Sequence, residues 1–170
     1  MRNILIIILM LVLVNIECLA QDANLNSFQG VWTWVDNSEE FTIELRLGTF
    51  EIPAILGGGT KECLVGGYKY VKNGITVIDN TNEIQLTKRS IDYPIRVLWN
   101  LTFTVRDPEL RNPKGEVKLL GGSSKIVPID DSTTIKWIIT DDEEHIYSSD
   151  DEVYPSGTSL PTNIILTKVE

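Results

Sequence analysis

The sequence predicts an all-β protein: a single antiparallel meander barrel or sandwich of roughly eight to ten strands, preceded by a signal peptide. Two observations carry this prediction. Apolar and polar residues alternate through several short segments, and polar turns separate those segments. After the first 20 residues, no segment keeps a helical apolar period for more than two turns. Sequential hairpins of this kind favour an up-and-down meander over a Greek key.

Alternation identifies the individual strands. Phe41–Leu47 places apolar side chains at every second position and Thr42, Glu44 and Arg46 between them, which is typical of a half-buried strand. The longest such segment is Ile95–Val105, which predicts one continuous strand with Trp99 and Phe103 buried on its apolar face. Further strands are predicted around Ile135, Trp137 and Ile139 and over 163–169.

Turn residues separate these strands. Asn73-Gly74 tolerates positive φ at both positions, so it predicts a tight hairpin between Tyr68–Val71 and Ile75–Ile78. Asp36–Ser38 predicts a second turn. A flexible loop is expected over 51–61, where Pro53 and Gly57–Gly59 interrupt the pattern. Further polar turns are expected over 79–82 and 130–133.

The first 20 residues are typical of a signal peptide. Arg2 precedes the uncharged apolar run Ile4–Val14, which is far shorter than the roughly 20 residues of a membrane-spanning helix. Small residues then precede Gln21, so we expect cleavage there and one all-β domain over 21–170, exported to the periplasm or secreted. Lipidation of Cys18 is the alternative, but Glu17 directly before it is not the small neutral residue that lipoprotein processing prefers.

After this cleavage Cys63 is the single cysteine, so the domain forms no internal disulfide. Cys63 begins the apolar segment Cys63-Leu64-Val65. A free cysteine in such a segment is expected to be buried.

Two segments carry a family resemblance. They are Phe28–Trp34 with Phe41–Leu45, and Leu64–Gly74, after an exported start that ends at Gln21. Together they resemble a family of small secreted Bacteroidetes proteins known only as a domain of unknown function, which implies no activity.

A second resemblance concerns Gly30-Val31-Trp32. It is similar to the Gly-x-Trp that opens the first strand of lipocalin barrels, which implies a lipocalin-like meander. The alternative is that Trp32 is an ordinary strand residue.

The sequence contains none of the usual catalytic or metal-binding motifs. There is one histidine, His145, and there is no nucleophile elbow, zinc-protease motif or phosphate-binding loop. Gly57–Gly59 lacks the lysine and helix that a phosphate loop requires. We therefore expect no enzymatic activity, no cofactor and no metal site.

Acidic residues are concentrated in one region. The segment 130–152 carries nine of them against Lys136 alone, and it accounts for most of the net charge of −9. Carboxylates on loops can bind Ca²⁺, but the spacing matches no calcium-binding motif, so solvated loops are the preferred interpretation. An acidic chain without a basic patch also argues against nucleic-acid binding.

Paired aromatic residues suggest a ligand site. Trp34 lies two residues after Trp32, and Tyr68 two before Tyr70, so each pair shares a strand face. Trp32 is assigned to the core, whereas Trp34, Tyr68 and Tyr70 are the candidate ligand-binding residues.

Two functions are consistent with these features. The first is a non-catalytic binding module for a small apolar or glycan ligand. The alternative is an interaction or structural domain of the cell envelope without a ligand cavity. A barrel of about eight strands is either just filled by side chains or holds one small ligand, so the interior should distinguish them.

Overall fold

The computed structural model describes residues 24–52, 54–84, 93–129, 133–140 and 155–169, and all ten of its strands lie in one antiparallel sheet. The strands are β1 (Gly30–Asp36), β2 (Glu39–Glu51), β3 (Thr60–Lys72), β4 (Ile75–Asp79), β5 (Ile95–Val97), β6 (Phe103–Arg111), β7 (Val117–Leu120), β8 (Lys125–Pro128), β9 (Thr134–Ile138) and β10 (Asn163–Val169). Three short 3₁₀ helices accompany them, namely η1 (Leu25–Phe28), η2 (Ala54–Leu56) and η3 (Thr81–Glu83). The predicted all-β antiparallel fold is confirmed, while the predicted signal peptide, residues 1–20, lies outside the described residues.

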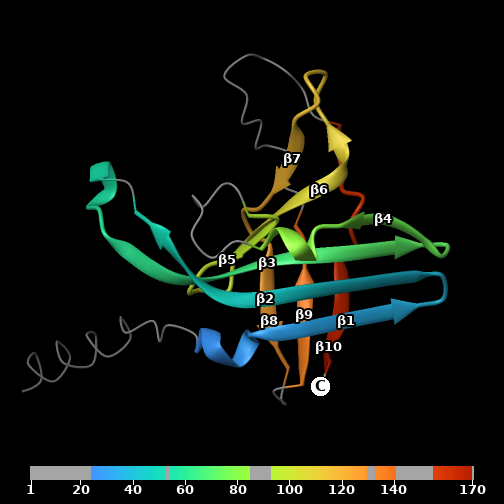
Figure 1. Cartoon of the computed structure of the whole chain (residues 1–170), viewed down its shortest axis with the longest axis horizontal. Helices are drawn as coiled ribbons and strands as arrows, with labels where there is room; N and C mark the ends of the chain where they lie inside the picture. Colours follow the sequence, from blue (N-terminus) through green and yellow to red (C-terminus); the bar gives the residue numbers. More distant parts are fainter. Residues whose placement is uncertain (1–23, 53, 85–92, 130–132, 141–154, 170) are drawn as a thin grey trace, which may run out of the picture.

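The sheet curls into a half-barrel. Its strand order is β7-β6-β5-β3-β2-β1-β10-β9-β8, with β4 beside β3. In Figure 1, β1 to β4 run together across the front and β8 to β10 cross behind them. The edge of β8 then meets the start of β6, where Ile126 N donates to Leu101 O at 2.9 Å and Phe103 N donates to Ser124 O at 3.0 Å. These bonds protect part of an otherwise open sheet edge.

The hairpin predictions agree with the structure at the ends of β3 and β1. Asn73 and Gly74 both have positive φ, 54° and 75°, as a two-residue turn between twisted antiparallel strands requires. Asn37, with φ of 47°, lies in the equally short turn that joins β1 to β2. The alternation in β2 is also confirmed, because Phe41, Ile43 and Leu45 are fully buried.

The predicted single strand over Ile95–Val105 is wrong. β5 ends at Val97, a turn follows, and β6 runs back from Phe103 beside β5. Leu101 N donates to Leu98 O at 2.9 Å to close the turn. Val97 pairs with Phe103, so the two strands bury the same face, and apolar residues recur at every second position through the turn.

The same turn changes the environment of Trp99. Asn100 Oδ1 accepts hydrogen bonds from the Thr102 hydroxyl at 2.7 Å and from Thr102 N at 3.3 Å, which stabilises the reversal. Phe103 is buried as predicted. Trp99, however, lies in the turn and is only half-buried, so its assignment to the main core is wrong.

The loop predicted over 51–61 is shorter than expected. β2 and β3 remain paired as far as Glu51 and Thr60, and Ile52 N donates to Gly59 O at 2.8 Å to close the connection. The result is a long two-stranded arm that extends beyond the rest of the sheet, with η2 near its tip (Figure 1).

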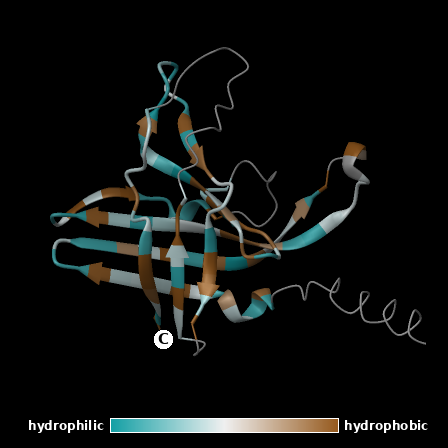
Figure 2. Cartoon of the chain, turned by 180° about the vertical axis from the view of Figure 1, so that it is seen from behind, coloured by the Kyte–Doolittle hydropathy of each residue, from teal (hydrophilic) through white to brown (hydrophobic). Residues whose placement is uncertain are grey.

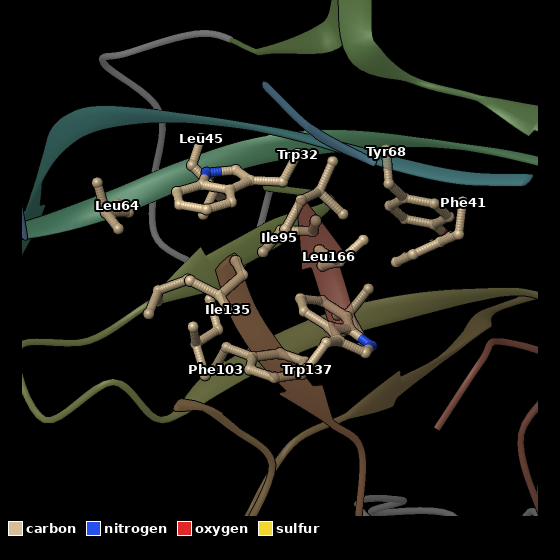
Figure 3. Packing of buried hydrophobic residues seen from close by; sticks show 14 of the residues in the cluster. Trp32, Phe41, Leu45, Leu64, Tyr68, Ile95, Phe103, Ile135, Trp137 and Leu166 are labelled. Atoms are coloured by element: carbon tan, nitrogen blue, oxygen red, sulfur yellow. The ribbon is translucent and has the colours of Figure 1, made fainter. Parts of the chain in front are cut away.

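Aromatic rings fill the middle of the half-barrel. Side chains from β1, β2 and β3 face those from β6, β9 and β10 (Figure 3). Phe41 contacts Tyr68 and Trp137, with ring centroids 5.8 and 5.6 Å away, and Trp137 in turn stacks on Phe103. Trp32 is buried among them, as expected from its position.

A smaller apolar cluster lies apart from this core. It contains Cys63, Val65 and Tyr93, with Phe50 and Ile84 packed against them. Cys63 is free and fully buried, which confirms the prediction made for it. Burial also raises the pKa of its thiol.

Asp107 is a fully buried carboxylate that joins β6 to the segment before β10. Its oxygens accept hydrogen bonds from the hydroxyl and the backbone N–H of Ser159 and from the hydroxyl of Thr158, at 2.6 to 2.8 Å. The backbone N–H groups of Glu109 and Leu110 also donate to it, at 3.0 and 3.1 Å. Five donors thus offset the cost of burying this group.

Across the residues that the structure describes, no helix combines the length and the apolar character needed to cross a membrane.

Candidate functional site

The aromatic residues proposed from the sequence lie at the inner face of the sheet. Trp34 pairs with Phe41, and Phe41 pairs with Tyr70, so the three side chains form one row across β1, β2 and β3. Phe41 therefore separates Trp34 from Tyr70. Tyr70 is 2% exposed and Tyr68 0%, whereas Trp34 is half-buried.

Both tyrosine hydroxyls have partners inside the protein. Tyr68 donates its hydroxyl to the carbonyl of Arg106. Burial raises the pKa of Tyr68, and the nearby charge of Asp107 adds to this effect. Burial and the hydrogen bond to Glu39 raise the pKa of Tyr70 to about 12. Both side chains therefore behave as neutral parts of the core.

A surface pocket of about 400 Å³ lies elsewhere, between η1, the beginning of β3 and the β5–β6 turn. This volume is within the range of roughly 300 to 1,000 Å³ that is typical of small-ligand sites. One aromatic residue lines it together with amide, hydroxyl, charged and aliphatic side chains. The lining residues are Asn24, Leu25, Asn26, Thr60, Lys61, Glu62 and Trp99.

Trp99 supplies the aromatic surface of this pocket. Its ring stacks on Phe50, with centroids 6.3 Å apart and planes inclined by 21°. The ammonium of Lys61 lies 4.1 Å from the centroid of the Trp99 ring. Lys61 pairs with Phe50 across β2 and β3, so both side chains leave the same face of the arm and contact the Trp99 ring there. Lys61 and Trp99 both line the pocket.

Phe50 lies beside Lys61 and packs against the ring of Trp99. The guanidinium carbon of Arg96 lies 5.7 Å from the Phe50 ring centroid, so Arg96, Phe50, Trp99 and Lys61 form one cation–aromatic series. Burial lowers the pKa of Arg96, and its Nε is buried without a hydrogen-bond partner in the described residues. A contact between a cation and an aromatic face contributes about 0.5–1 kcal/mol when exposed and more when desolvated.

The opposite wall of the pocket is η1, which is anchored to the sheet. The indole N–H of Trp32 donates to Phe28 O at 2.9 Å, and Leu47 N donates to Gln29 Oε1 at 3.3 Å. Asn24 caps the start of η1, and its Oδ1 accepts a hydrogen bond from Asn26 N at 3.3 Å. Oxygen atoms of the Asn24 and Asn26 side chains are used within this segment, so their NH₂ groups are the donors available to a ligand.

Sequence reasoning missed this pocket because its residues come from three separate segments. The sequence pattern places Trp99 on a strand face and Lys61 in a flexible loop. One feature could have indicated the turn: Leu98 interrupts the polar face of the predicted strand, and Asn100 with Thr102 follows it in the spacing of an Asx turn.

The predicted acidic loop, Asp141–Glu144, and His145 lie outside the described residues, so the absence of a calcium site there stays a prediction. In the remainder, no group of three or more histidine, cysteine, aspartate or glutamate side chains is placed to hold a metal ion.

These features define an antiparallel β half-barrel with a ring-filled interior and an aromatic pocket on its surface. The sequence pattern of the family of unknown function DUF6705 matches residues 1–169, and the chain belongs to this family. No curated protein and no solved structure matches the chain.

Proposed function

We propose that this protein is a non-catalytic binding module that holds a saccharide ring in the pocket at Trp99. The observation that carries the proposal is the fixed indole of Trp99 in a pocket of about 400 Å³ with a polar rim. The proposal includes export of the mature chain, because residues 1–20 have the pattern of a signal peptide.

The chemistry of the pocket suits a sugar better than an apolar molecule. One face of a pyranose ring presents C–H groups, which match the negative face of an aromatic ring. Its edge presents hydroxyl groups, which match the Asn24 and Asn26 amides, the Thr60 hydroxyl and the Glu62 carboxylate. A purely apolar ligand would displace water from these polar groups without replacing the hydrogen bonds of that water.

The packing of the half-barrel supports the surface pocket over its interior. Phe41, Tyr68, Phe103 and Trp137 occupy the space that a ligand would take between the two halves of the sheet. Each of these four side chains is at most 2% exposed. An apolar ligand in the interior would have to displace rings that stabilise the fold.

The test is a titration of the full chain, with and without residues 1–20, against a panel of mono- and oligosaccharides. Binding is followed by ligand-observed NMR and by tryptophan fluorescence. We expect Trp99→Ala to abolish binding and Trp99→Phe to retain part of it, because only the first variant removes the aromatic surface on which the sugar packs. Trp34→Ala is the matched control, and it should leave binding unchanged. Equal loss in both variants would refute the site.

One observation favours the alternative, an interaction domain. Ile55, in η2 of the projecting arm, is 92% exposed, and the tip of the arm is coloured as apolar in Figure 2. If the arm binds another copy of the chain, sedimentation should show association that depends on concentration. Ile55→Ser should then abolish this association, while saccharide binding stays unaffected.

A further inference from the structure

We infer that the saccharide bound at Trp99 is acidic, and that its anionic group pairs with the ammonium of Lys61. This inference rests on the proposed function, because it concerns the ligand of the same pocket. Its basis is the position of Lys61: the ammonium lies 4.1 Å from the Trp99 ring centroid, and both residues line the pocket.

Lys61 is exposed and makes no ion pair with a carboxylate among the described residues. The ion pairs found there join Arg46 to Glu44 and Lys72 to Glu39. The chain has a net charge of −9, so many carboxylates are present with which an exposed ammonium could form an ion pair. The Lys61 ammonium lies over an indole instead, where it remains available to an anion.

A neutral sugar and an acidic sugar would affect Lys61 differently. A neutral ring that stacks on Trp99 must displace the ammonium and lose its contact with the indole, which is worth about 0.5–1 kcal/mol. A ring that carries an anionic group can pair with the same ammonium as it settles on the indole. Hydrogen bonds between charged groups are about twice as strong as those between neutral groups.

Glu62 determines how an acidic sugar is oriented in the pocket. Lys61 and Glu62 are consecutive on β3, so their side chains leave opposite faces of the strand, and both line the pocket. The carboxylate of Glu62 repels an anionic group and accepts hydrogen bonds from hydroxyl groups. The anionic group therefore faces Lys61, and the hydroxyl edge of the ring faces Glu62.

A carboxylate and a sulfate both pair with an ammonium, so either can be the anionic group. The experiment separates them with three matched probes: a methyl glucuronide, a methyl glucoside 6-sulfate and the neutral methyl glucoside, together with the same set in the galacto series. Each probe is titrated into the wild-type protein, Lys61→Met and Lys61→Arg, with Trp99→Ala as the reference for loss of the site. The melting temperature of every variant confirms that it is folded.

We expect at least one acidic probe to bind about tenfold more tightly than its neutral counterpart, as one hydrogen bond between charged groups implies. Lys61→Met should abolish this preference and bind the neutral probe no more weakly than the wild type does. Lys61→Arg should keep it. The preference should also shrink as NaCl rises from about 0.05 to about 0.5 M, because salt screens exposed charges.

Two results would overturn the inference, and they have different consequences for the proposed function. If neutral and acidic probes bind equally and Lys61→Met changes neither, the pocket binds sugars without selecting for charge, and the proposed function stands. If no probe binds in either series, including longer oligosaccharides of each kind, the proposed function fails and the inference fails with it.

Discussion

Phe103 and Trp137 stack with their ring centroids 3.9 Å apart and their planes inclined by 24°, although β6 and β9 are not neighbours in the sheet. The contact crosses the interior of the half-barrel. Trp137 also contacts Phe41 on the opposite side, with centroids 5.6 Å apart. One continuous group of rings therefore connects both halves of the curled sheet and fills the interior that a ligand would otherwise occupy.

This packing predicts unequal effects of two aromatic truncations that the sequence alone would have treated as equivalent. Phe103→Ala removes a buried ring from the core and should lower the free energy of unfolding by about 3–5 kcal/mol. Trp99→Ala removes a half-buried ring from a surface turn and should cost much less. Denaturant melts of the two variants measure the difference, and equal losses would contradict the hairpin described for 95–111.

Asp107 should be essential for the attachment of the segment before β10. Asp107→Ala leaves partly buried donors on Ser159, Thr158 and the β6 backbone without an acceptor, and an unsatisfied buried group costs about 1–3 kcal/mol. We expect a loss at the upper end of that range or beyond it.

Asp79→Ala is the matched control for Asp107→Ala. The Asp79 carboxylate also accepts hydrogen bonds from a nearby hydroxyl and N–H, those of Thr81, but it is exposed. Removing the Asp79 carboxylate should lower the free energy of unfolding by at most about 1 kcal/mol, because water can accept the hydrogen bonds from Thr81 instead. Similar melting temperatures for the two variants would contradict a structural role for Asp107.

The raised pKa of Tyr70 predicts a loss of stability at alkaline pH. A tyrosine in the unfolded chain ionises near pH 10, whereas the pKa of Tyr70 in the folded protein is raised to about 12. Above about pH 10 the unfolded state releases its proton before the folded state does, so the free energy of unfolding falls as the pH rises toward 12. Below about pH 10 the contribution of Tyr70 is fully present.

Tyr70→Phe removes this titration, so its free energy of unfolding should fall less between about pH 9 and about pH 11.5 than that of the wild type. Tyr68→Phe should act in the same direction, because the pKa of Tyr68 is also raised. Chemical denaturation at a series of pH values provides the measurement. A fall in stability that is identical in the wild type and in both variants would contradict the raised pKa values.

Much of the sheet could be predicted because its strands and turns are determined by residues that are close together in the sequence. The alternation in Phe41–Leu47, the positive-φ turn at Asn73-Gly74 and the closing strand at 163–169 each depend on a few consecutive residues. The burial of Trp32 and Cys63 followed from the same local patterns. The family resemblance also rested on such segments, and the match over residues 1–169 agrees with it.

The boundary between β5 and β6 could not be predicted from alternation. A continuous strand and a hairpin whose two strands bury the same face give the same apolar pattern, so the pattern of Ile95–Val105 predicts one strand. The reversal depends on the Asn100–Thr102 hydrogen bonds and on the contact between β6 and β8, which joins segments far apart in the sequence.

The sequence by itself determined the all-β class, the identity of most strands and the burial of their alternating apolar side chains, because backbone geometry makes neighbouring residues face opposite sides of a sheet. Only the tertiary structure decided that rings fill the interior and that Trp99 faces outward. It also brought Asn24, Lys61 and Trp99 to one pocket. The physical reason is that a pocket depends on how a sheet curls and where its loops meet, and these are set by packing between distant segments.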